Sequence, residues 1–142
     1  MEYVQKLIAA AIKARDNAYC PYSKFAVGAA LITERGKIYT GCNIENVTYG
    51  LCVCGERTAF LKAVSEGEKK FKALAVVSGK VGSPPSGFAF SCGICRQVFA
   101  EFCDKDFLLI VAESEKRYKT STLGELFPNA FSPRDIDFST KV

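Results

Sequence analysis

The most informative absence in this sequence is histidine, since none of its 142 residues is a histidine. Without an imidazole, the Ser-His-Asp triad, the Cys-His nucleophile pair and the histidine-ligated zinc sites of metalloproteases are all excluded. If the chain is an enzyme, it must therefore move protons with a carboxylate, a lysine, a tyrosine or a cysteine.

Long apolar runs are also missing, although 49% of the residues are hydrophobic. No run approaches the roughly 18 residues that a membrane-spanning helix needs. The first residues, MEYVQKLIAAAIKARD, carry an early acidic side chain and alternate polar with apolar positions, which is typical of an amphipathic helix and not of a signal peptide. We therefore expect a soluble, cytoplasmic protein that does not associate with membranes.

Charge of one sign does not dominate any part of the chain. The 19 Lys and Arg residues exceed the 15 Asp and Glu residues by a net charge of +4, and they are scattered. A nucleic-acid surface would show a basic stripe interleaved with aromatic residues. We expect no nucleic-acid partner, and the chain is too short to add a separate platform for one.

Cysteine, by contrast, is abundant, with seven residues at positions 20, 42, 52, 54, 92, 95 and 103. An odd number without a secretory signal argues against a disulfide framework. Some of these cysteines must then fill the core, and others are available to bind a metal.

The apolar pattern predicts a single domain over residues 1–142, with helices packed on a mixed sheet. The later strands should pair in parallel, because single helices connect them. The predicted helices span 2–18, 55–66 (ended by Gly67), 93–103 and a short stretch after Ser121 or Thr122, and the predicted strands span 25–33, 37–45, 71–78 and 107–112, with a hairpin turn at 34–37.

Three cysteines lie where predicted helices begin: Cys54, Cys92 and Cys95. Cys92 and Cys95 are three residues apart, so at a helix start both thiols point the same way. The free N–H groups and positive partial charge of a helix N-terminus stabilise thiolates. Three thiolates that leave a fourth position open are typical of a catalytic zinc site.

Glu56 shares the predicted apolar helix face of Ala59 and Phe60. A carboxylate on a buried face is costly unless it is paired or hydrogen-bonded. Two residues from a candidate zinc ligand, it is suited to act as a general acid and base beside a metal-bound water. A simpler alternative, that Glu56 only complements the helix dipole, leaves the preceding Cys54 unexplained.

Other interpretations of these residues stay open at this point. Cys92 and Cys95 could be buried small side chains, and Cys52 could complete a four-thiolate structural site in a non-catalytic zinc module. Arg57 and Arg96, which are next to the ligands, could donate hydrogen bonds to the sulfurs or form surface ion pairs.

The pairs Cys54-x-Glu56 and Cys92-x-x-Cys95 match the ligand and acid pattern of zinc deaminases. Beyond these pairs the chain resembles the small, homotetrameric, zinc-dependent cytidine deaminases from about residue 19 to residue 131. The matching segments are Tyr22-Ser23-Lys24-Phe25, Val27-Gly28-Ala29-Ala30, Gly41-Cys42-Asn43-Ile44-Glu45-Asn46, Tyr49-Gly50, Glu56-Arg57-Thr58-Ala59, Cys92-Gly93 with Cys95-Arg96-Gln97, and Leu123-Gly124-Glu125-Leu126.

The resemblance implies a three-layer α-β-α fold with a mixed, mostly parallel-ended five-stranded sheet. It implies one Zn²⁺ per subunit, hydrolytic deamination of free cytidine and 2′-deoxycytidine in pyrimidine salvage, and a homotetramer with shared active sites. The implied roles are zinc binding by Cys54, Cys92 and Cys95, proton transfer by Glu56, contact with the thiolates by Arg57, ribose binding by Asn43 and Glu45, and substrate contacts by Phe25, Tyr49, Gly55, Ser91 and, from a neighbouring subunit, Phe131.

Two positions depart from the pattern of that family. Gly55 replaces the usual Ala and keeps the backbone N–H that would bind the base. Ser91 replaces the usual Pro and so loses its fixed φ. These departures bear on substrate preference, and a related activity on another aminopyrimidine nucleoside or a nucleoside antibiotic is the alternative function.

Overall fold

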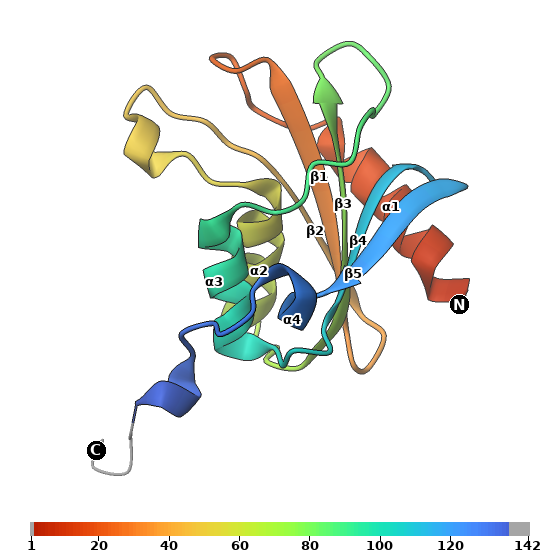
Figure 1. Cartoon of the computed structure of the whole chain (residues 1–142). Coiled ribbons are helices and arrows are strands. Elements are labelled where there is room, and N and C mark those ends of the chain that lie inside the picture. Colours follow the sequence, from red (N-terminus) through yellow and green to blue (C-terminus); the bar gives the residue numbers. More distant parts are fainter. Residues whose placement is uncertain (1, 137–142) are drawn as a thin grey trace.

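Helices cover both faces of one five-stranded sheet in the computed structural model, which describes residues 2–136 (Figure 1). The helices are α1 (Glu2–Arg15), α2 (Gly55–Ser65), α3 (Gly93–Phe102) and α4 (Leu123–Leu126), with short 3₁₀ turns η1 (Tyr49–Leu51) and η2 (Pro133–Asp135). The strands are β1 (Phe25–Thr33), β2 (Ile38–Cys42), β3 (Phe71–Lys80), β4 (Leu108–Ser114) and β5 (Arg117–Thr122). No helix within these residues is long and apolar enough to cross a membrane.

The strand order β2-β1-β3-β4-β5 confirms the expected mixed sheet. Parallel pairing is confined to β3 and β4, which α3 connects, and the other three neighbouring pairs are antiparallel. The pattern of the sequence identified four of the strands but did not locate β5. Its residues RYKTST are polar and mostly exposed, so they lack the apolar signal of a core strand.

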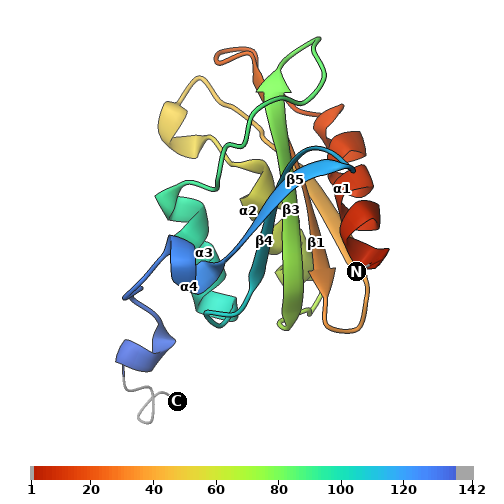
Figure 2. The same cartoon turned by 45° about the vertical axis from the view of Figure 1, so that its right-hand side comes forward.

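The two faces of the sheet have separate cores, which gives the three expected layers. Alternate residues of a strand point to opposite faces, so Leu31 of β1 packs with Phe60 of α2 and Phe99 of α3, whereas Ala30 packs with Leu7 of α1. Figures 1 and 2 show α1 on one side of the sheet and the pair α2 and α3 on the other.

Most predicted boundaries agree with the structure to within a few residues. β1 covers the predicted span, and α2 ends just before Gly67, whose φ of +95° suits a glycine after a helix. The Thr122 side chain caps α4 by accepting a hydrogen bond from the Glu125 N–H at 3.2 Å. β2 is shorter than predicted and ends at Cys42, because the next residue, Asn43, uses its side chain to bind β1.

Two glycines bring the helices into backbone contact with the sheet. A Cβ atom on Gly28 would lie 2.1 Å from the carbonyl oxygen of Ala11 in α1. On the opposite face, a Cβ atom on Gly41 would lie 2.5 Å from the backbone nitrogen of Ala59 and 2.6 Å from the carbonyl oxygen of Gly55, both in α2. No other residue type fits at these positions without moving a helix.

We expect Gly28→Ala to lower the free energy of unfolding by at least about 2 kcal/mol, because the added methyl group would overpack the contact between β1 and α1. Urea denaturation would measure the change. Gly50→Ala is the matched control, since nothing lies within 4 Å of the Cβ it would add. Equal unfolding free energies for the two variants would contradict the close packing at Gly28.

Candidate functional site

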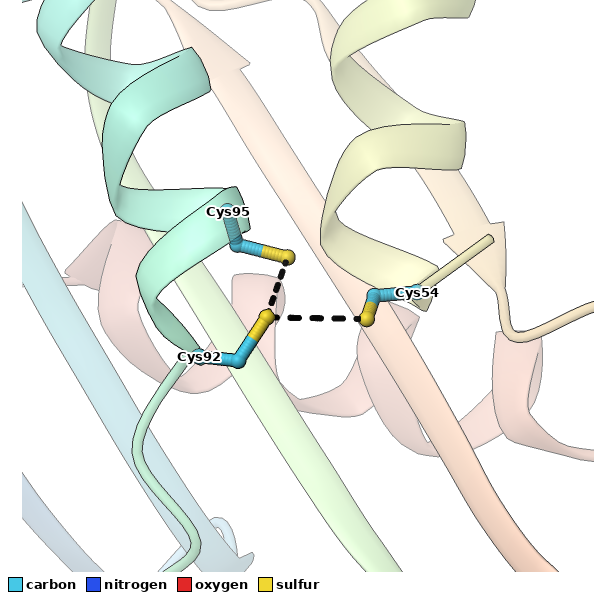
Figure 3. Close-up of side chains that lie close together, drawn as sticks. All are labelled: Cys54, Cys92 and Cys95. Atoms are coloured by element: carbon cyan, nitrogen blue, oxygen red, sulfur yellow. Dashed lines mark hydrogen bonds between the residues drawn. The ribbon is translucent and has the colours of Figure 1, made fainter. Parts of the chain in front are cut away.

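Three cysteine sulfurs meet between the N-termini of α2 and α3 (Figure 3). Cys54 is the N-cap residue of α2, Cys92 is the N-cap residue of α3, and Cys95 lies in the first turn of α3. The Sγ atom of Cys92 is 3.9 Å from that of Cys54 and 3.6 Å from that of Cys95, and all three sulfurs lie within 4.8 Å of one another. The fold thus unites the three cysteines that the sequence indicated as metal ligands.

The donor set fits a zinc ion. Sulfurs bound at about 2.3 Å to a tetrahedral zinc lie about 3.8 Å apart, and the separations of 3.6 and 3.9 Å in the structure bracket that value. Thiolates also favour zinc over hard cations such as magnesium and calcium. One metal ion can therefore bind to these three side chains with little rearrangement.

Arg57 contacts the cysteine cluster, as the sequence suggested. Its Nη2 atom donates to the Sγ of Cys54 at 3.6 Å and to the carbonyl oxygen of Cys52 at 3.3 Å. A hydrogen bond with Cys95 and the guanidinium group of Arg57 lower the pKa of Cys54 to about 5. The same bond and burial raise the pKa of Cys95, so Cys54 ionises first.

The suggestion that Arg96 also donates to the sulfurs is wrong. Its Nε atom donates to the carbonyl oxygen of Ser91 at 2.7 Å, and its Nη1 atom donates to the carbonyl oxygen of Leu126 at 2.6 Å. The side chain extends from α3 and connects the segment before Cys92 to the end of α4. The position of Arg96 next to Cys95 in the sequence did not reveal that its side chain bonds to carbonyl oxygens.

Glu56 is buried, with 5% of its surface exposed. Burial raises the pKa of its carboxyl group, and the Ser91 hydroxyl opposes part of that increase. A group that only complemented the helix dipole could remain exposed to water, so burial beside Cys54 favours a chemical role. A carboxyl group with a raised pKa is suited to both accept and donate a proton near neutral pH.

A cavity of about 390 Å³ adjoins the cysteine cluster, which is a volume suited to a small molecule. Its lining includes seven of the residues that the sequence indicated: Phe25, Asn43, Glu45, Cys54, Glu56, Arg57 and Cys92. The sheet contributes further lining residues that sequence reasoning missed, namely Val27 of β1 and Val76 and Ser78 of β3. In the sequence these residues belong to nearly continuous apolar runs, so nothing separates them from core positions.

Asn43 and Glu45 both border the cavity, although β2 ends before them. The Asn43 side chain accepts a hydrogen bond from the Val27 N–H and donates one to the Phe25 carbonyl oxygen, both at 2.8 Å. Glu45 Oε1 accepts from the N–H groups of Tyr22 at 3.0 Å and Ser23 at 3.1 Å. The Ser23 hydroxyl and these amides lower the pKa of Glu45, so this side chain is an anion at neutral pH.

Four of the expected substrate contacts do not line the cavity of this single chain. Tyr49 is 71% exposed on η1, where its ring packs edge-on against Tyr22 at 5.6 Å between ring centres. Phe131 is 58% exposed, and its carbonyl oxygen accepts a hydrogen bond from Gln97. The other two, Gly55 and Ser91, are buried at the starts of the segments that carry Glu56 and Cys92.

Cys52 is not part of the cysteine cluster within the described chain. Its Sγ atom accepts a hydrogen bond from the Asn46 N–H at 3.3 Å and lies 3.7 Å from the Asn46 carbonyl oxygen. The four-thiolate structural site therefore lacks its proposed fourth ligand, and the open side of the three sulfurs borders the cavity.

Comparison with known proteins gives consistent results. The family model for the cytidine and deoxycytidylate deaminase zinc-binding region matches residues 1–111. The chain is 50% identical to a cytidine deaminase from Sporosarcina psychrophila over 97% of this chain and 98% of that protein. It is 46% identical to a cytidine deaminase from Halalkalibacterium halodurans over 94% of this chain and 97% of that protein. The crystal structure of cytidine deaminase from Burkholderia pseudomallei superposes with a TM-score of 0.78 and 42% identity, over 89% and 97% of the two chains.

We expect Cys92→Ser to reduce bound zinc to well below one equivalent, because a hydroxyl group is a much weaker zinc ligand than a thiolate. Metal analysis after dialysis against a mild chelator would measure the loss. Cys52→Ser, as the matched control, should keep its zinc. If Cys52→Ser lost the metal to the same extent, Cys52 would have to be a ligand.

Proposed function

Since this chain belongs to the cytidine deaminase family, we propose that it hydrolyses free cytidine and 2′-deoxycytidine to uridine and 2′-deoxyuridine and releases ammonia. The observation that carries this proposal is the buried carboxyl group of Glu56 in the same small cavity as the cysteine cluster. That arrangement combines a proton carrier with a metal site beside a space large enough for a nucleoside.

Cys54, Cys92 and Cys95 would hold one zinc ion per chain. When bound, zinc supplies Lewis acidity that lowers the pKa of water to about 7 and so provides the attacking nucleophile. Three thiolates carry more negative charge than the positive charge of the zinc ion. This excess weakens the ion as a Lewis acid. Arg57, with its hydrogen bond to Cys54, would offset part of that excess.

Glu56 would carry both protons of the water that is consumed. Its carboxylate takes the first proton and delivers it to ring N3 while the water oxygen bonds to C4. It then transfers the second proton to the amino group, the bond between C4 and that nitrogen breaks, and ammonia leaves. The raised pKa of Glu56 suits this exchange, because the group must release each proton as readily as it accepts it.

The ribose would lie against Asn43 and Glu45, with the ring of Phe25 as an apolar wall. In the described chain, the hydrogen bonds of Glu45 to Tyr22 and Ser23 use Oε1, which leaves Oε2 for a sugar hydroxyl. Gly55 would offer its N–H and Ser91 its carbonyl oxygen to the base. The Ser91 oxygen already accepts one bond from Arg96, and a carbonyl oxygen has capacity for a second.

Tyr49 and Phe131 would act in a homotetramer. Both are more than half exposed, as are Tyr19, Val47 and Leu51, and Ile44 is 46% exposed. Large exposed apolar side chains of this kind suit burial against another subunit, and Phe131 would then reach a neighbouring site. We further propose that residues 1–142 act as one domain and that the enzyme works in the cytoplasm in pyrimidine salvage.

We expect Glu56→Ala and Glu56→Gln to lower kcat by a factor of about 10²–10⁴, since each removes the group that transfers the protons. Both variants should keep their zinc, because no metal ligand is changed. Release of ammonia and uridine from cytidine by zinc-loaded protein is the measurement. Near-normal turnover by either variant would remove Glu56 from this role.

A zinc-loaded wild-type protein that released no product would defeat the cytidine assignment itself. A panel of other aminopyrimidine nucleosides and nucleoside antibiotics would then identify the substrate.

We expect Glu45→Gln to raise KM for cytidine about tenfold, the usual cost of losing a hydrogen bond to a charged group. The value of kcat should change little, because the ribose lies away from the reacting carbon. Glu101→Gln, an exposed change on α3, is the matched control. An unchanged KM in Glu45→Gln would mean that the carboxylate only holds the turn at Tyr22 and Ser23.

A further inference from the structure

One wall of the cavity comes from the segment 81–91, which leaves the end of β3 and returns to the start of α3 (Figure 1). Ala89 and Phe90 of this segment line the cavity, and Cys92 of the cysteine cluster follows directly. Gly82 and Gly87 have φ values of +83° and +78°, and Ser91 does not fix its own φ as a proline would. The position of this wall must therefore be set by contacts with the rest of the chain.

Both ends of the segment are held by arginine side chains. Arg15 of α1 donates to the carbonyl oxygens of Lys80 and Ser83, both at 2.9 Å. At the other end, Arg96 of α3 donates to the carbonyl oxygen of Ser91 at 2.7 Å. Between these ends, the Ser86 N–H donates to the carbonyl oxygen of Ser78 in β3 at 2.9 Å. The wall lies in the stretch that follows, from Gly87 to Ser91, and that stretch needs a separate attachment.

That attachment is the hairpin formed by β4 and β5. Glu113 Oε1 accepts a hydrogen bond from the Gly87 N–H at 2.7 Å, while Glu113 Oε2 pairs with Arg117 Nε at 2.6 Å. Within the described residues, this is the side-chain hydrogen bond that holds the backbone between residues 84 and 90. The cationic groups of Arg117 and Lys119 also lie over the Phe88 ring, 5.7 and 4.5 Å from its centre.

We propose that Glu113 is a positioning residue for the proposed deamination, holding Gly87 and thereby the wall at Ala89 and Phe90. The inference rests on the proposed function, and it assigns a role in the site to a hairpin that contributes no residue to the cavity lining. Phe90 is three residues beyond Gly87, a span of up to about 10 Å in extended chain. Release of the anchor at Gly87 therefore lets the wall shift relative to the substrate.

The test compares Glu113→Ala with Glu113→Gln, which keeps an oxygen that can accept from Gly87. We expect Glu113→Ala to raise KM for cytidine about tenfold, with a much smaller change in kcat, as for loss of a hydrogen bond to a charged group. Zinc content and melting temperature should stay near wild type, because the cysteine cluster is anchored by the helices. Glu113→Gln should restore most of the KM.

Hydrogen exchange supplies a readout that does not depend on turnover. The amides of residues 88–92 should exchange faster in Glu113→Ala than in wild type and return towards wild type in Glu113→Gln. Glu115→Ala is the matched control, since Glu115 is an exposed carboxylate in the same hairpin. It should leave both KM and exchange unchanged.

Wild-type KM and exchange in Glu113→Ala would overturn the inference. So would failure of Glu113→Gln to restore them, or a general loss of zinc and thermal stability in Glu113→Ala. If wild-type protein released no ammonia from cytidine, the proposed function would fail, and exchange in residues 88–92 would still decide whether Glu113 positions the wall.

Discussion

Two helix N-termini meet at the cysteine cluster, and the rest of the site depends on how closely α2 approaches the sheet. Gly41 permits that approach, because any side chain there would collide with the backbone of α2. The stacked rings of Phe60 and Phe99, 5.1 Å apart, then set α3 beside α2. These two contacts help to place Cys54, Glu56 and Cys92 around one cavity.

Charge in the site is concentrated and only partly compensated. Three thiols and the Glu56 carboxyl group lie close together, with Cys95 and Glu56 buried, and Arg57 is the cation that bonds to Cys54 within the described chain. Neighbouring thiols resist simultaneous ionisation because like charges repel, and the pKa of Cys54 is accordingly lowered while that of Cys95 is raised. A divalent cation removes this conflict, which is the physical reason for a metal at this position.

Around this centre, side chains that hold backbone groups shape the cavity. Asn43 binds the backbone of β1, Glu45 binds the turn at Tyr22 and Ser23, and Arg15, Arg96 and Glu113 hold the segment that ends at Cys92. The bonds of Glu45, Arg96 and Glu113 satisfy backbone groups outside regular secondary structure, where ladder partners are lacking. Strands and helices form part of the cavity lining, and these attachments fix the position of the loops that form the rest.

Local patterns in the sequence determined the strands of the core, the helix starts and the residues at those starts. Cys54, Glu56, Cys92 and Cys95 could be predicted because helix periodicity and capping act over a few residues. Tertiary structure alone decided that Cys52 bonds to Asn46, that Arg96 turns away from the sulfurs, that Ser78 faces the cavity and that a polar β5 completes the sheet. These outcomes depend on loop geometry and on contacts between separate elements, and neither leaves a periodic signal in the sequence.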